Sequence, residues 1–160
     1  MSVKTVSIPP SFILGAAASA WQTEGWTGKK EGQDSWPDLW YKNDRHVWHD
    51  GYGPAVATNF YSRFREDVQL MKDAGLTHYR TSINWSRFLT DYEKGVVDEE
   101  YAAYYDQLFA EMERQGVVPM LFLEHYELLR YLLVIYGGWA FNKVVELYLL
   151  YVEKVFERFH

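Results

Sequence analysis

The order of strands and helices constrains the fold of this chain more than any other feature of its sequence. Strand-like segments at 12–20, 77–83 and 118–123 alternate with helical patterns over about 55–74, from Asp98 to Gly116, and from Asn142 to the last residue. Strands that alternate with helices form a parallel sheet with right-handed crossovers. The sequence therefore predicts an α/β fold of three βα units with parallel strands, in a single domain over residues 1–160.

Specific residues mark the ends of the first two helices. Gly75 and Gly116 follow them as C′ residues. Asp98 is placed to cap the second helix, and Glu99 and Glu100 stand in its first turn, where the helix dipole favours negative charge. Both helices are therefore expected to stop just before the next strand.

The three strands differ in polarity. Segments 12–20 and 118–123 are apolar, and we expect both to be buried parallel strands. Segment 77–83 is too polar for a strand buried on both faces, and Arg80 lies inside it. An arginine in such a strand needs an explanation from function or from pairing.

The connections after the strands are the expected location of a functional site. In strand–helix proteins the carboxyl ends of parallel strands meet at one edge of the sheet, and the loops there carry the chemistry. These connections are 21–53, 84–97 and 124–140, which we expect to be loops. Within the last of them, segment 128–135 is unusually apolar for a loop.

Composition excludes several classes of partner. The formal net charge of -6 at pH 7 argues against nucleic acids and anionic membranes. No apolar run approaches the ~20 residues that span a bilayer, and the N-terminus lacks the apolar run of a signal peptide. There is no cysteine for a disulfide or a thiolate metal site. We expect a cytoplasmic protein with no metal and no other cofactor.

Four motifs follow one another along the chain: FILGAAASAWQTE at 12–24, YRTSINWSR at 79–87, LEHYE at 123–127 and YGGW at 136–139. Together they resemble glycoside hydrolase family 1, the retaining β-glucosidases and 6-phospho-β-glucosidases. The resemblance covers about residues 10–159 and implies the first three units of a (β/α)8 TIM barrel. Trp21 and segment 36–53 look closest to the bacterial 6-phospho-glucosidase branch.

The resemblance also implies an activity that depends on two carboxylates about 5–5.5 Å apart. In the family the acid/base lies in an Asn-Glu-Pro motif after the fourth strand, and the nucleophile in a Glu-Asn-Gly motif after the seventh. Neither motif occurs in these 160 residues. We therefore expect an N-terminal, excised or engineered piece of a barrel, with no catalytic residue and no turnover alone. The alternative is an active enzyme when other chains complete the barrel.

Three residues match positions with known roles in the family. Gln22 and His125 match residues that bind the glycone, the sugar on the non-reducing side of the scissile bond. Arg80 matches the arginine that pairs with the nucleophile carboxylate and lowers its pKa. Without that carboxylate, Arg80 should be solvated or paired with another acid. Glu24 belongs to the first motif and is expected to be structural.

Two observations leave alternatives open. Glu124 and Glu127 flank His125, which is compatible with a metal site or a new acid/base pair, although the family has an aspartate at the position of Glu127. Five of the seven tryptophans lie in 21–48. Such rings either stack on sugar rings or pack within the loop, and the sequence does not decide between the two.

The last helix and the loop before it carry apolar residues where a barrel would meet water. Leu150 falls inside the polar face of that helix and Leu149 at its edge. Three strands would also leave two open sheet edges. We therefore expect a homo-oligomer that buries those edges and an apolar patch, with at most a weak sugar ligand. The expected interface residues are Leu129, Val134, Ile135, Phe141, Leu149 and Leu150.

Overall fold

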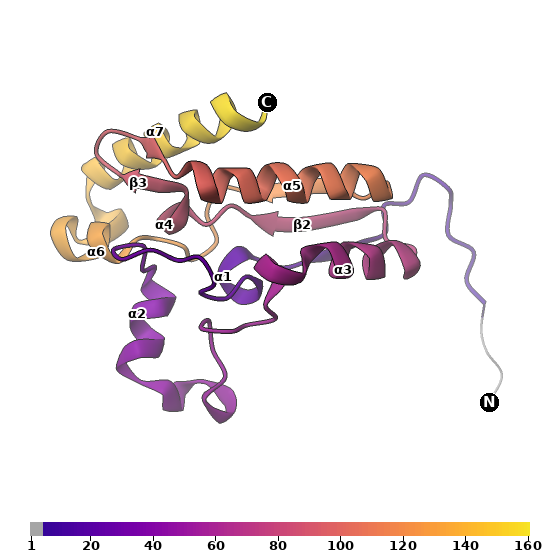
Figure 1. Ribbon diagram of the computed structural model, residues 1–160, viewed down its shortest axis with the longest axis horizontal. Helices are drawn as coiled ribbons and strands as arrows, with labels where there is room; N and C mark the ends of the chain where they lie inside the picture. The colour runs from indigo at the N-terminus through magenta and orange to yellow at the C-terminus, as the bar shows by residue number, and fades with distance from the viewer. Residues whose placement is uncertain (1–4) are drawn as a thin grey trace.

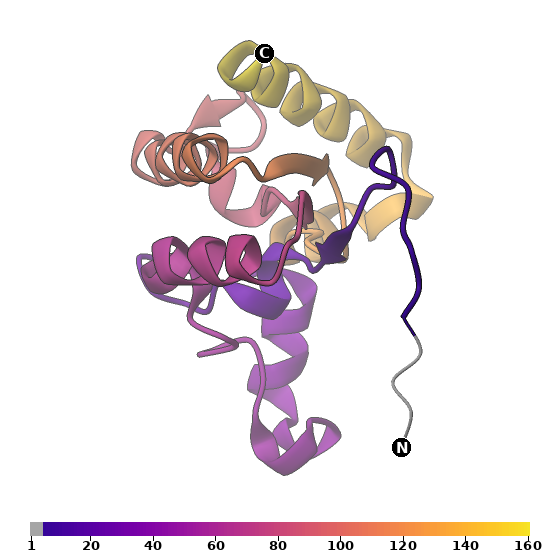
Figure 2. The same cartoon turned by 90° about the vertical axis from the view of Figure 1, so that its right-hand side faces the viewer.

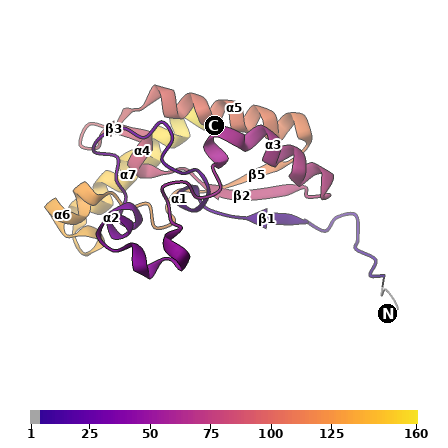
Figure 3. The same cartoon turned by 60° about the horizontal axis from the view of Figure 1, so that its bottom comes forward.

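The computed structural model describes residues 5–160 and contains a three-stranded parallel sheet. Its strands are β1 (Gly15–Ala17), β2 (His78–Ser82) and β5 (Val118–Phe122), in the order β1-β2-β5 (Figure 3). The register aligns Ala17 with Arg80, and Arg80 with Met120. The predicted parallel pairing is confirmed, with the polar strand in the centre.

Two long helices connect these strands and pack against each other. They are α3 (Phe60–Asp73) and α5 (Glu99–Gln115), and Figure 2 shows them side by side. The Asp98 carboxylate caps α5 by accepting the Tyr101 N–H, as predicted. Gly75 and Gly116 both have positive φ angles just past the helices, so a side chain there would be strained.

The outer strands are more exposed than predicted. Strand β1 is only three residues long, and all three are exposed. In β5 the side chains of Val118, Met120 and Phe122 are 50%, 50% and 46% exposed. The expectation of two buried strands was wrong because, within residues 5–160, each outer strand has one neighbour and nothing covers the sheet face opposite the helices. Apolar composition alone does not distinguish the centre of a sheet from its edge.

The three connections expected to be loops contain regular structure. After β1 come α1 (Ala20–Thr23), α2 (Trp36–Asn43) and two short 3-10 helices, η1 (Arg45–Val47) and η2 (His49–Gly51). After β2 come α4 (Trp85–Phe88) and a hairpin of β3 (Leu89–Asp91) and β4 (Val96–Val97). After β5 come α6 (Arg130–Tyr136) and η3 (Gly138–Ala140). Figure 1 shows α2 projecting away from the sheet. The apolar segment that was unusual for a loop is therefore mostly helix.

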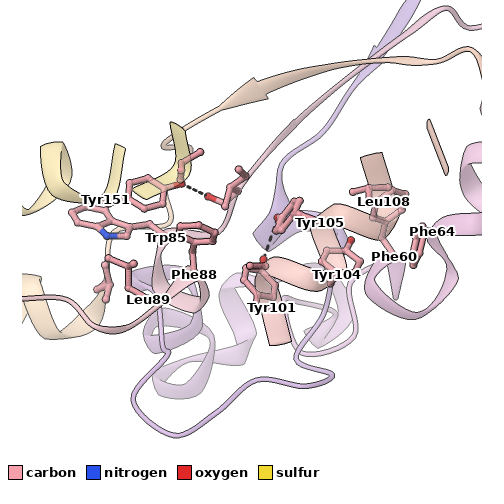
Figure 4. Close-up of a cluster of buried hydrophobic side chains, with 14 of the residues drawn as sticks. Phe60, Phe64, Trp85, Phe88, Leu89, Tyr101, Tyr104, Tyr105, Leu108 and Tyr151 are labelled. Carbon is pink, nitrogen blue, oxygen red and sulfur yellow. Dashed lines mark hydrogen bonds between the residues drawn. The ribbon is translucent and has the colours of Figure 1, made fainter. Parts of the chain in front are cut away.

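The core lies between the sheet and its helices and is rich in aromatic side chains (Figure 4). Trp85 and Tyr151 stack with ring centroids 5.3 Å apart, and the buried Tyr151 hydroxyl donates a 2.9 Å hydrogen bond to the Ile83 carbonyl. That bond ties the last helix, α7 (Asn142–Phe159), to the end of β2. Tyrosine suits this position, because its ring packs in the core while its hydroxyl satisfies a buried backbone carbonyl just after the last residue of β2.

The expected interface residues divide into two groups. Val134, Ile135, Phe141 and Leu149 are exposed, as an interface requires. Leu129 is fully buried at the start of α6, so its prediction as an interface residue was wrong. Leu150 is half-buried, because it lies against the hairpin turn at Gly95 instead of facing outward. None of the helices in the described residues is both long enough and apolar enough to span a membrane.

Candidate glycone-binding site

The three residues matched to family roles all lie at the carboxyl-terminal side of the parallel sheet. Gln22 is in α1, just after β1, while Arg80 is within β2 and His125 follows β5. Parallel pairing brings these strand ends to one edge, as the sequence predicted. The site therefore draws on all three strands of the sheet.

Arg80 connects the outer strands across the sheet. Its Nη1 donates to the Ala18 carbonyl at 3.3 Å and lies 3.5 Å from His125 Nδ1. Its guanidinium carbon lies 4.4 Å from the centroid of the Phe122 ring, a cation–π contact at the end of β5. Among residues 5–160 its polar contacts include no carboxylate, so its charge stays available at the edge of the sheet.

The half-buried His125 ring is suited to hydrogen bonding with a neutral ligand. Burial lowers the pKa of His125, and the neighbouring Arg80 charge lowers that pKa further. The imidazole is therefore neutral near pH 7, with one nitrogen as donor and the other as acceptor. A sugar hydroxyl, itself both donor and acceptor, matches such a group.

Gln22 is exposed, and its amide is partly used. The Ser19 hydroxyl donates to Gln22 Oε1 at 2.7 Å, and this hydrogen bond does not use the two amide N–H groups of Gln22. Gln22 also lines a cavity of about 820 Å³ together with Trp21, Trp48 and the chain from Asp50 to Thr58. The side chain thus lines a cavity large enough for a sugar.

A buried hydrogen-bond chain fixes the backbones beside Gln22 and His125, and sequence analysis did not predict it. The Ala20 N–H donates to Ser82 Oγ at 2.8 Å, the Ser82 hydroxyl donates to Glu127 Oε1, and the His125 N–H donates to Glu127 Oε2. Ser82 and Glu127 are fully buried. One serine hydroxyl and one carboxyl therefore link the ends of all three strands.

Burial makes the Glu127 carboxyl neutral at pH 7. Desolvation raises the pKa of Glu127 to about 8, although the bonds from Ser82 and His125 oppose this shift. Burial also raises the pKa of Glu124, against hydrogen bonds from following backbone N–H groups. A neutral, enclosed Glu127 cannot serve as an exposed acid/base group, which weakens the alternative of a new catalytic pair. Residues 5–160 contain no cluster of three or more His, Asp or Glu side chains suited to a metal ion.

Glu24 has a structural position, consistent with its expected role. Its carboxylate lies 3.3 Å from Arg87 Nη1 and accepts hydrogen bonds from the Tyr101 and Tyr105 hydroxyls. The Arg87 guanidinium lies 4.4 Å from the Tyr101 ring centroid and 4.8 Å from that of Tyr61. The ion pair is fully enclosed and joins the end of α1 to α4 and α5, so it supports the site from behind.

Comparison with known proteins identifies the relatives of this arrangement. The profile of the family described as glycosyl hydrolase family 1 matches residues 4–160. The chain is 34% identical over 152 residues to 6-phospho-beta-glucosidase GmuD of Bacillus subtilis, covering 94% of this chain and 32% of the relative. It is 36% identical to Beta-glucosidase 4 of Oryza sativa subsp. japonica, covering 94% of this chain and 31% of that one.

A solved structure gives the same result for the fold. The psychrophilic beta-glucosidase BglU from Micrococcus antarcticus superimposes with a TM-score of 0.83 at 33% identity, covering 96% of this chain and 32% of BglU. The chain thus spans about a third of the length of these relatives. Its three parallel strands and their helices are part of a (β/α)8 barrel, as the motifs predicted.

Proposed function

Because this chain belongs to glycosyl hydrolase family 1, we propose that its residues form one side of the glycone-binding surface of a β-glucosidase-type enzyme. The observation that carries the proposal is the position of Arg80, which contacts both Ala18 at the end of β1 and His125 after β5. Gln22 and the neutral His125 ring would hold sugar hydroxyls. The free charge of Arg80 would hold a carboxylate supplied by the rest of a barrel.

We further propose that these 160 residues hydrolyse no glucoside by themselves. Retaining hydrolysis needs two carboxylates that both reach the glycosidic bond. Glu127 is enclosed, and its two oxygens are engaged by Ser82 and His125. We expect no turnover of an aryl β-glucoside or of its 6-phosphate. Measurable turnover that Glu124→Gln or Glu127→Gln abolishes would contradict this proposal.

A fusion tests the binding role directly. We expect hydrolysis when residues 1–160 replace the matching part of rice Beta-glucosidase 4, which shares 36% identity with them. Gln22→Ala and His125→Ala should each lower kcat/KM of the folded fusion by about tenfold or more. The matched control is His49→Ala, because the side chain of His49 is 95% exposed. A cooperatively melting fusion without activity, or with activity unaffected by these two substitutions, would refute the role.

A second proposed property is self-association, which the open sheet favours. Strands β1 and β5 each have one unpaired edge within residues 5–160, and the exposed face of β5 carries Val118, Met120 and Phe122. Such edges and faces pair readily with other chains. Sedimentation velocity should detect oligomers that Leu149→Glu weakens. A compact, folded monomer over the accessible concentration range would eliminate this proposal.

A further inference from the structure

A hollow beside α6 is not used by the functions described so far. Its volume is about 470 Å³, and its walls come from all three connections: segment 31–34 after β1, Tyr92 after β2, and α6 after β5. Figures 1 and 3 both show α6 at one end of the molecule, beyond the carboxyl ends of the strands. No residue of the parallel sheet lines the hollow, so it is separate from the unpaired strand edges.

Hydrogen bonds between the connections hold the walls of this hollow in place. The Tyr92 hydroxyl donates to the Gly32 carbonyl at 3.2 Å, and the Arg130 N–H donates to the Asp34 carbonyl at 2.8 Å. The rings of Tyr92 and Tyr131 stack with centroids 5.9 Å apart and planes 30° apart. Because the hollow is already formed, a partner that enters it does not have to order its walls first.

One wall of the hollow exposes aliphatic side chains that contact no core. Val134 and Ile135 are 61% and 58% exposed, and Tyr131 and Leu133 on the same helix are also exposed. Leu132 is the only buried residue of α6. Large apolar side chains gathered on one short helix are typical of a surface that binds a partner.

The hollow also carries charges of both signs. Arg130 and Glu31 line it, and both residues are exposed. The Asp34 carboxylate, which lines it too, is occupied by Lys29 at 3.0 Å and by Lys42 at 2.7 Å. The salt bridges among residues 5–160 include neither Arg130 nor Glu31. One small surface therefore presents a cation and an anion, each without an ionic partner in that range, beside exposed apolar side chains.

We propose that this hollow is a contact with a second copy of the same chain, related by a two-fold axis. In such an interface the same patch lies on both copies, so each feature meets its complement twice. Val134 and Ile135 of each copy enter the hollow of the other, and each Arg130 faces the Glu31 of the other copy. A lipid surface fits less well, because it presents no side chain that fills a hollow and pairs with both charges.

This inference rests on the proposed self-association only for the fact that two copies meet. It assigns that contact to a surface that contains no residue of β1, β2 or β5. A longer chain that pairs the open strand edges should therefore still dimerise through the hollow.

Cross-linking of single cysteines tests the proximity of the two copies. The chain has no cysteine, so Val134→Cys introduces one thiol per copy. A short bismaleimide should give about fivefold or more covalent dimer than the matched control Val56→Cys, because the interface raises the effective concentration of the thiols. Val56 is 68% exposed compared with 61% for Val134, but it lies outside the hollow.

Reversal of the charges tests the pairing of Arg130 with Glu31. Arg130→Glu and Glu31→Arg should each weaken dimerisation about tenfold or more in sedimentation equilibrium, because two like-charge contacts replace two opposite ones. The combined variant should recover most of the lost affinity. The control is Lys72→Glu, which reverses an exposed charge on α3 outside the hollow. Circular dichroism confirms that each variant is folded.

Met120→Asp separates this interface from association through the sheet. Met120 is on the exposed face of β5, so the Val134→Cys cross-link should persist in a folded double variant. Loss of that cross-link, or oligomers unaffected by the charge reversals, would overturn the hollow while self-association through the sheet stands. Monomers that bind phosphatidylcholine vesicles and do not cross-link would assign α6 to a lipid surface and would also overturn the inference.

Discussion

The most informative perturbation is Glu127→Gln, because it tests the ionisation of a single buried carboxyl group. The Ser82 hydroxyl donates to Glu127 Oε1 in the structure, and protonation of the carboxyl allows that bond to reverse, with the Glu127 O–H donating to Ser82 Oγ while the other oxygen still accepts the His125 N–H. A glutamine reproduces both contacts, with its N–H groups facing Ser82 and its oxygen facing His125. The variant therefore imitates the protonated carboxyl but cannot ionise. Any pH-dependent difference between the two proteins reports the ionisation of Glu127.

The size of that difference follows from the pKa of Glu127, which burial raises from 4.5 to about 8. Between these values the folded state keeps a proton that the unfolded state has released, so stability falls as pH rises. The stabilising contribution of the neutral form is complete below pH 4.5 and is lost by about pH 8. At about 1.36 kcal/mol per pH unit, the wild-type protein should lose about 4 kcal/mol relative to Glu127→Gln between pH 5 and pH 8.

Urea unfolding followed by circular dichroism measures this difference at half-unit pH steps, at one protein concentration so that self-association does not vary. We expect similar stabilities for the two proteins near pH 5 and a more stable variant near pH 8. Glu146→Gln controls for the loss of one negative charge, because the Glu146 side chain is 69% exposed. A difference between Glu127→Gln and the wild type that stays constant from pH 5 to pH 8 would refute a neutral, buried Glu127.

Two further substitutions test the supports behind the site. Glu24→Gln should destabilise the chain by about 3 kcal/mol in urea unfolding at pH 7, because it leaves the enclosed Arg87 charge without its carboxylate. An unchanged stability would mean that the Gly25 and Thr27 carbonyls, which also accept from Arg87, satisfy that charge alone. Tyr151→Phe should cost about 1–2 kcal/mol, because it removes the buried donor to the Ile83 carbonyl. A neutral effect of Tyr151→Phe would indicate that the carbonyl gains a water molecule.

Local signals in the sequence predicted the order and type of the main elements, and non-local contacts decided what those signals could not. Asp98 and Gly116 mark the ends of α5 because capping and positive φ depend on adjacent residues. The apolar neighbours of Leu129 predict an exposed patch, but Leu129 is buried where it pairs with Ser35, far away in the chain. Local signals do not predict the helix α6 either, because the segment is short and its stability comes from tertiary packing. The expectation of an excised or engineered chain stays a prediction.

The candidate site also contains residues that local motifs predict and residues whose role depends on non-local contacts. Motifs identified Gln22, Arg80 and His125, and parallel pairing explains why they lie at one edge of the sheet. Ser82 was inside a motif but was not chosen, because a serine at a strand end has no distinctive pattern of its own. Its role depends on strand register. Because Ser82 is paired with Phe122, the last residue of β5, it lies beside the following loop, which carries Glu127. Because Ser82 also accepts the Ala20 N–H, a shift of one residue in either pairing would break the hydrogen-bond chain that joins the segments carrying Gln22 and His125. The sugar-binding geometry proposed for this chain therefore depends on strand register as much as on the identity of the residues that would touch the sugar.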